Sequence, residues 1–263
     1  MPEIKVVFDA ADDYERVMGQ WSRAVGERFL DWLAPASGQR WLDVGCGTGA
    51  FTELVLKRCA PKIIAGIDPA AAQIELARKQ TPQGDFRVAD AAALPFGADE
   101  FDIIASALVI NFIPDRPAAF REMHRVSRRG ATVSAYQWDR RKDENHSPFA
   151  LIESGLRAIG AEVLQPPIVP EATPDGARAA LERAGFADIE TATIEARRSF
   201  RSFEDYWDVQ VIPISPAGKS IAALGEAKRA ELRDVMRSAL PAAADGSVSY
   251  ASRALVFKAR KSE

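Results

Sequence analysis

The chain has 263 residues, of which 47% are hydrophobic and 27% charged, and its formal net charge is −3. This composition excludes a disordered or low-complexity chain, and the slight negative charge argues against a nucleic-acid-binding protein held by bulk electrostatics. No apolar run approaches the roughly 20 residues of a membrane-spanning helix, and the N-terminus lacks a signal-peptide pattern. Cys46 and Cys59, the only cysteines, suggest no disulfide framework, so we expect a cytoplasmic protein.

The first predicted element is an amphipathic helix within residues 9–33. Its apolar side chains recur at steps of three and four, which is the helical period. They are Tyr14, Val17, Met18, Trp21, Val25, Phe29 and Leu33.

A regular alternation of strands and helices begins at Arg40. The apolar runs and the Pro and Gly breaks predict strands over 40–44, 62–68, 85–90, 101–110 and 131–138. Helices are predicted between them over 49–59, 69–80 and 115–130, with Pro69 at the first position of the second helix. This spacing implies right-handed crossovers and a parallel, doubly wound α/β sheet with helices on both faces.

The pattern changes after Trp138. Residues 187–200 and 245–260 read as two late strands, and we expect the last one to run antiparallel. They bring the expected sheet to about seven strands. The polar and helical segments 140–180 and 203–245 are then insertions at its edge and not separate domains.

A glycine-rich loop follows the first strand, in the run LDVGCGTG. Gly45, Gly47 and Gly49 allow a tight turn and a close approach of the backbone to a ligand. Ligands of open α/β sheets bind outside the carboxyl ends of the strands, where this loop lies. The same letters, with Ala50, satisfy the dinucleotide-binding fingerprint, and in either kind of site Asp68 could bond a ribose diol.

Two further carboxylates distinguish the alternatives. Asp43 stands two residues before Gly45 and would repel the pyrophosphate of a dinucleotide. Asp90 closes the third strand, so Asp43, Asp68 and Asp90 place three acidic groups on one rim. Such a rim favours a cationic nucleoside over an anionic one.

The ordered motifs LDVGCGTG, GID, VADAAALPF and FDIIASALVINFIPD resemble those of the class I S-adenosylmethionine-dependent methyltransferases. Within that class they resemble the small-molecule group that includes the ubiquinone- and menaquinone-biosynthesis C-methyltransferases. The resemblance covers about residues 40–138 and is specific for the cofactor, not for the methyl acceptor. It implies a single Rossmann-like domain over 1–263, with a helical lid at 9–33, a cofactor-binding core at 40–138 and acceptor-side insertions at 140–180 and 203–245.

The resemblance also implies which residues hold S-adenosylmethionine. Asp43 would hold the amino group, Asp68 both ribose hydroxyls, and Asp90 the adenine amino group beside the Ala91 backbone. Arg23 would bind the cofactor carboxylate. The other residues implied at the cofactor are Gly45, Cys46, Gly47, Gly49, Pro69, Gln73 and Ser106.

The acceptor side is expected to use Tyr14, Trp21, Asn111 and His146. His146, in a polar loop after the fifth strand, is the candidate general base. The histidines, cysteines and acids have no metal-ligand spacing. The predicted reaction is direct transfer of a methyl group to a small, apolar or aromatic acceptor, with no nucleic acid or membrane as partner. A cofactor-binding regulatory protein without transfer activity and an NAD-dependent oxidoreductase remain as alternatives, and the acceptor, the methylated atom and the oligomeric state stay open.

Overall fold

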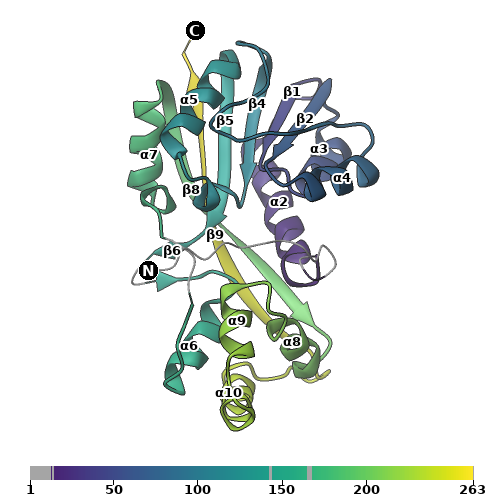
Figure 1. The fold of residues 1–263 in the computed structure, drawn as a ribbon, viewed down its shortest axis with the longest axis vertical. Helices are drawn as coiled ribbons and strands as arrows, with labels where there is room; N and C mark the ends of the chain where they lie inside the picture. The colour runs from purple at the N-terminus through teal and green to yellow at the C-terminus, as the bar shows by residue number, and fades with distance from the viewer. Residues whose placement is uncertain (1–12, 14, 142–143, 165–167, 263) are drawn as a thin grey trace.

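The computed structural model describes residues 13, 15–141, 144–164 and 168–262. Its main sheet has seven strands in the order β3-β2-β1-β4-β5-β9-β8, with helices around it (Figure 1). The first five strands in the chain run parallel, and β9 is antiparallel to both of its neighbours. The strands are β1 (Arg40–Val44), β2 (Ile63–Asp68), β3 (Asp85–Val88), β4 (Phe101–Ala107), β5 (Ser127–Trp138), β8 (Phe186–Phe200) and β9 (Val248–Lys261). The prediction of a doubly wound sheet of about seven strands with an antiparallel last strand is confirmed.

Helices cover both faces of the sheet, which is why the central strands are apolar almost throughout. On one face Trp41 packs in a cluster with residues of α2 (Gln20–Leu33) and α3 (Ala50–Cys59). Its neighbour Leu42 points to the other face, into a cluster with α5 (Arg116–Val126) and α7 (Pro174–Arg183). The remaining core helix, α4 (Ala71–Gln80), packs on β2 and β3.

The long strands β8 and β9 continue beyond the rest of the sheet and carry a second group of helices. Figure 1 shows this group at the lower end of the molecule, below the sheet and its covering helices. The cluster that contains Trp41 extends without interruption into this group through Ile152, Phe203 and Leu232. The helices are α6 (Ala150–Ala158), α8 (Phe203–Gln210), α9 (Pro216–Ala222) and α10 (Glu226–Ala239).

Several element boundaries differ from the expectation. Helix α4 begins at Ala71, so Pro69 is not its first residue; the Asp68 carboxylate accepts a hydrogen bond from Ala70 N and turns the chain first. Helix α5 ends at Val126 and not at 130, because the following residues already belong to β5. The strands predicted over 85–90 and 101–110 end at Val88 and Ala107.

The N-terminal segment begins its described part with a π-helix, η1 (Glu15–Gly19), which runs into α2. Arg198 of β8 holds this turn, since its guanidinium donates to the carbonyls of Arg16 at 2.8 Å and Val17 at 2.9 Å. Tyr14 and residues 9–12 of the predicted lid lie outside the described residues. Across the described chain, every helix is too short or too polar to cross a membrane.

Candidate functional site

The loop between β1 and α3 has a backbone that strongly favours glycine. Gly45 has φ +79° and Gly47 has φ +54°, both in the left-handed region. A Cβ at Gly45 would also overlap the side chain of Val109, from the segment after β4. The loop is fixed to β2, because Gly45 N and Cys46 N both donate to Ile67 O. These contacts fix the loop backbone at the carboxyl edge of the sheet, where it lines a cavity.

Asp43 lies at the end of β1 and is only 2% exposed. Its Oδ2 accepts a 2.7 Å hydrogen bond from Thr52 Oγ1, while its Oδ1 receives none from the described residues. Burial raises the pKa of Asp43 from 3.8 to about 7, with a smaller contribution from the nearby charge of Asp68. A buried carboxyl with a pKa near neutrality is typical of a ligand-binding site.

Asp68 and Asp90 follow β2 and β3 on the same edge. Asp68 accepts from Gly47 N at 3.1 Å and from Ala70 N at 2.9 Å, so it ties the glycine loop to the end of β2. Burial raises its pKa. Asp90 is exposed and accepts from Ala92 N at 2.8 Å. Each carboxylate offers about four lone-pair positions, so both keep acceptor capacity for a ligand.

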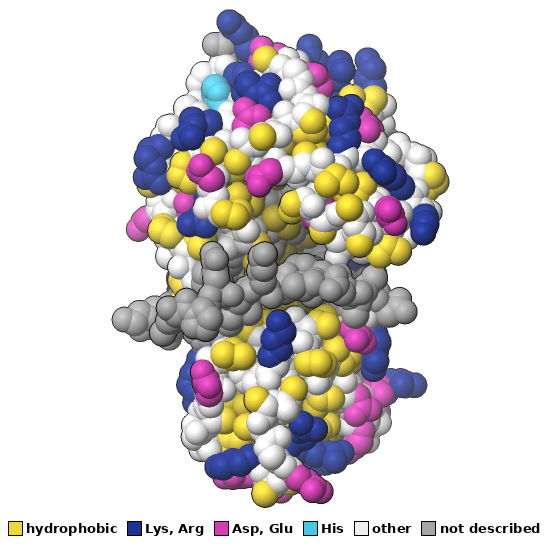
Figure 2. All heavy atoms as spheres, in the orientation of Figure 1, with side chains coloured by type: hydrophobic (Ala, Val, Ile, Leu, Met, Phe, Trp, Pro, Cys, Tyr) yellow, Lys and Arg dark blue, Asp and Glu magenta, His cyan; other side chains and the backbone are white. Residues whose placement is uncertain are grey.

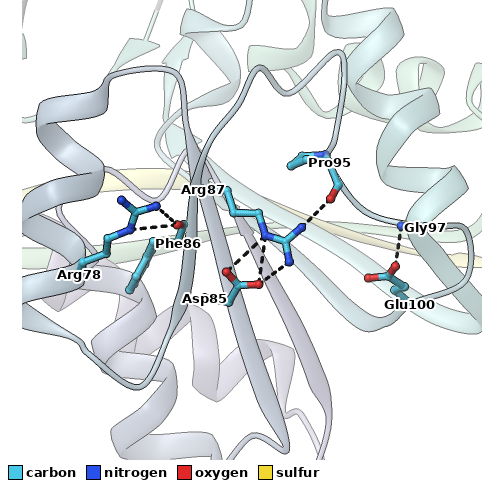
Figure 3. A network of polar contacts seen from close by, with 7 residues as sticks. All are labelled: Arg78, Asp85, Phe86, Arg87, Pro95, Gly97 and Glu100. Carbon is cyan, nitrogen blue, oxygen red and sulfur yellow. Dashed lines mark hydrogen bonds and ion pairs between the residues drawn. The ribbon is translucent and has the colours of Figure 1, made fainter.

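Side chains of β3 and α4 fix the loop that carries Asp90 (Figure 3). Arg87 pairs with Asp85 and donates to the Pro95 carbonyl at 2.7 Å, which fastens the far end of that loop. On the other side Arg78 of α4 donates to the Phe86 carbonyl at 2.7 Å. Together these bonds tie β3 to α4 and to the far end of the loop that carries Asp90.

The three carboxylates line one cavity of about 900 Å³. In the view of Figure 2, hydrophobic side chains border the hollow just above the narrowest part of the molecule, and the carboxyl ends of the parallel strands lie at this level in Figure 1. Beyond the carboxylates the wall is mostly apolar. Besides the glycine loop, it is lined by Gly19, Ser22, Phe51, Leu108, Val109, Asn111, Phe112, Ile113, Pro114, Arg116, Tyr136, Ile168, Val169, Pro170 and Pro216, among others.

Most residues expected at the cofactor lie on this cavity. Its wall includes Asp43, Gly45, Cys46, Gly47, Asp68, Pro69, Gln73, Asp90 and Ala91, and also Asn111, which was expected on the acceptor side. Gly49 is not part of the wall: it has φ +88°, precedes α3, and faces Ala77, Thr81 and Phe86.

Besides Gly49, four predicted residues lie away from the wall. Ser106 is buried and donates to Val44 O at 3.0 Å. Arg23 is exposed on α2. Trp21 is 1% exposed, with its ring 6.0 Å from Trp138 and 5.2 Å from Tyr250, so it belongs to the core.

His146, the candidate base, also lies away from the wall. Its backbone bridges the chain after β5 and the middle of β9, donating to Asp139 O and accepting from Arg253 N, both at 2.9 Å. No described contact brings its side chain to the cavity, so its role as a base stays a prediction.

Comparison with known proteins agrees with this geometry. The family described as "Methyltransferase domain" matches residues 42–135. The chain is 31% identical over 129 residues to a malonyl-[acyl-carrier protein] O-methyltransferase of Serratia marcescens, which covers 47% of this chain and 50% of the relative. It is 33% identical over 135 residues to a 2-phytyl-1,4-naphtoquinone methyltransferase of Thermosynechococcus vestitus, covering 48% and 60%.

A solved structure shares the fold along nearly the whole chain. The phosphoethanolamine N-methyltransferase 2 of Haemonchus contortus, solved with S-adenosyl-L-methionine, aligns with a TM-score of 0.56 at 16% identity, covering 95% of this chain and 56% of that one. The part of the chain from β1 to β5 matches a methyltransferase domain, and the fold is the one seen in this solved methyltransferase. The chain matches only about half the length of its first curated relatives, through the part from β1 to β5.

The residues of this cavity fit S-adenosylmethionine. The glycine loop presents backbone without Cβ atoms, and Asp43 keeps one buried oxygen without a donor among the described residues. Asp68 and Asp90 keep free acceptor positions. The wall residues missed from the sequence, such as Phe51, Tyr136 and Pro216, come from helices and strands whose burial pattern alone reads as ordinary core.

Proposed function

We propose that this methyltransferase moves a methyl group from S-adenosylmethionine to a small-molecule acceptor held at the apolar end of the cavity. The proposal rests on one observation above all: three strand-end aspartates share a cavity whose other lining residues are mostly apolar. Bound S-adenosylmethionine supplies an activated methyl group on a sulfonium. The chain then has to align the acceptor with that methyl and exclude water.

Each rim residue has a role in this proposal. Asp68 accepts from the ribose hydroxyls while keeping its bonds to Gly47 N and Ala70 N. Asp90 accepts from the adenine amino group, with Ala91 beside it, and Asp43 holds the cofactor ammonium. The Gly45 and Gly47 backbone lies under the methionine part, and Gln73 lines the ribose side.

The acceptor side is proposed to include Asn111, Phe112, Ile113 and Tyr136, which line the same cavity from β5 and the segment after β4. We further propose that residues 1–263 act as a single unit, since one apolar cluster joins the sheet to the second group of helices. A cytoplasmic location stays the expectation from the cysteine content.

Calorimetry and a transfer assay test the function together. S-adenosylhomocysteine should bind the purified protein, whereas NAD should not, because the three carboxylates oppose a pyrophosphate. Labelled S-adenosylmethionine should then pass its methyl group to a compound in the low-mass fraction of a cell extract. Binding without any transfer would support the regulatory alternative, and binding of NAD alone would support the oxidoreductase.

A further inference from the structure

One cationic side chain lines the described part of the cavity wall, and a neighbouring carboxylate balances its charge. Among the described lining residues, Arg116 is the only Lys or Arg, and the acidic ones are the three rim aspartates. Arg116 Nε donates to Glu171 Oε2 at 3.0 Å, and its Nη1 donates to Ile113 O at 2.9 Å. The Glu171 side chain is only 7% exposed and that of Arg116 is 23% exposed. This ion pair is therefore part of a mostly dry wall.

Glu171 is also held from a second side. It belongs to the short 3-10 helix η3 (Pro170–Ala172), whose neighbours Val169 and Pro170 line the cavity. The side chain of Gln137, from β5, donates to the Glu171 carbonyl. Because the backbone of Glu171 is anchored, its carboxylate stays beside Arg116 and balances the charge of the guanidinium within the wall.

Apart from the rim aspartates and Arg116, the described lining residues are uncharged. Asn111 and Ser22 supply polar side chains, and Phe51, Val109, Phe112 and Ile113 supply apolar ones. A carboxylate or phosphate entering here would leave water and meet no cation among the described lining residues except Arg116, whose charge Glu171 already balances, and burying an unpaired charge is costly. The rim aspartates would add repulsion.

We propose that the acceptor is an uncharged, largely apolar molecule, and that the Arg116–Glu171 pair determines this specificity by keeping the guanidinium neutralised. The inference rests on the proposed function and adds the chemical class of its substrate. It separates this chain from relatives and fold neighbours whose names include malonyl or phosphoethanolamine groups.

Two probes of equal shape test the charge selection. Calorimetry on the protein saturated with S-adenosylhomocysteine compares 2-naphthamide, which is neutral, with 2-naphthoate, which carries a carboxylate. The amide should bind at least about tenfold more tightly, since the anion loses its hydration without a cation in return. Equal or tighter binding of 2-naphthoate, or no binding of either probe, would overturn the inference.

Substitutions in the Arg116–Glu171 pair test whether the pair causes the preference for the amide over the carboxylate. Glu171→Gln frees the Arg116 charge and should shrink the amide preference at least several-fold, while Arg116→Gln leaves Glu171 unbalanced and should enlarge it. Glu204→Gln is the matched control, because Glu204 pairs with Arg237 at an exposed site on α8, outside the cavity wall. An unchanged preference in folded Glu171→Gln would overturn the role of the pair.

The two proposals fail in different ways. If S-adenosylhomocysteine does not bind at all, the proposed function fails. If it binds but the probes are not discriminated, only the inference about the acceptor class fails.

Discussion

Thr52, in the first turn of α3, donates a 2.7 Å hydrogen bond to Asp43 at the end of β1, across the glycine loop that separates them. Thr52 is fully buried, so this bond is shielded from water and fixes one carboxylate oxygen. The other oxygen, Oδ1, is the one that receives no hydrogen bond from the described residues. The Thr52 hydrogen bond therefore fixes the orientation of the Asp43 carboxyl on the cavity wall, with one of its two oxygens bonded.

Asp43 should make cofactor binding depend on pH. Its pKa of about 7, raised mainly by burial, means that the carboxyl ionises as the pH rises through neutrality. Only the ionised form attracts the ammonium of S-adenosylhomocysteine, so affinity should increase between about pH 6 and pH 8. Asp43→Asn should bind more weakly and lose this dependence in calorimetry. An equally pH-dependent affinity in the variant would contradict the assignment.

The same group predicts the pH dependence of stability in the unliganded protein. The folded pKa lies above the ordinary value of 3.8, so the folded state holds the proton more tightly than the unfolded state. The contribution of Asp43 to the free energy of unfolding is then fully present below about pH 4 and is lost as the pH rises toward 7. Asp43→Asn should remove this part of the loss, which urea unfolding at pH 4.5 and pH 7.5 can measure.

Asp68→Ala should weaken the binding of S-adenosylhomocysteine at least about tenfold, because each charge-assisted hydrogen bond to the ribose contributes roughly 1.5–3 kcal/mol. The variant also loses the bonds from Gly47 N and Ala70 N, so its melting temperature should fall by a few degrees. Asp31→Ala, which removes an exposed carboxylate paired with Arg58, is the control and should leave affinity unchanged. Retained affinity in Asp68→Ala would limit Asp68 to a structural role.

Gly45→Ala and Gly38→Ala separate backbone strain from the fit of the loop. Both glycines have a left-handed φ, +79° and +74°, which costs a non-glycine residue about 1–2 kcal/mol. Only at Gly45 would the new methyl group meet Val109, whereas Gly38 has open space around it. Thermal melts should show a larger loss for Gly45→Ala, and only that variant should lose cofactor affinity. Equal effects of the two variants would rule out the steric explanation.

Arg198 should control the N-terminal part of the cavity wall. Its bonds to the Arg16 and Val17 carbonyls hold the π-helix that leads to Gly19, a wall residue. Arg198→Met should speed tryptic cleavage after Arg16 and weaken cofactor binding, while Arg197→Met, at an exposed neighbour, should do neither. Mass spectrometry of the digest measures the first effect. Unchanged cleavage would mean that packing alone holds the turn.

Local sequence patterns are enough to predict the alternating core and the strand-end residues of the proposed cofactor site. Strand and helix periodicity depends on neighbouring residues, and the glycine loop, Asp68 and Asp90 each follow a strand whose end can be located from the chain alone. In a parallel sheet those ends meet at one edge, so their convergence could be predicted without coordinates. The predicted start of α4 at Pro69 and the predicted end of α5 after Val126 are wrong. The first boundary depends on the hydrogen bond from Ala70 N to the Asp68 carboxylate, and the second on the pairing of β5 in the sheet.

The acceptor end was decided only by the tertiary structure. Trp21 lies on the apolar stripe of the predicted N-terminal helix and was expected at the acceptor. Trp138 and Tyr250, far along the chain, pack against its ring and bury it in the core. Arg116 and Glu171 lie 55 residues apart and pair only because η3 folds back over the start of α5. Local sequence carries no signal for such contacts, since they depend on how loops of unrelated length pack against one sheet edge. The sequence motifs therefore predict which cofactor the protein binds, whereas the charge balance between Arg116 and Glu171 depends on tertiary packing.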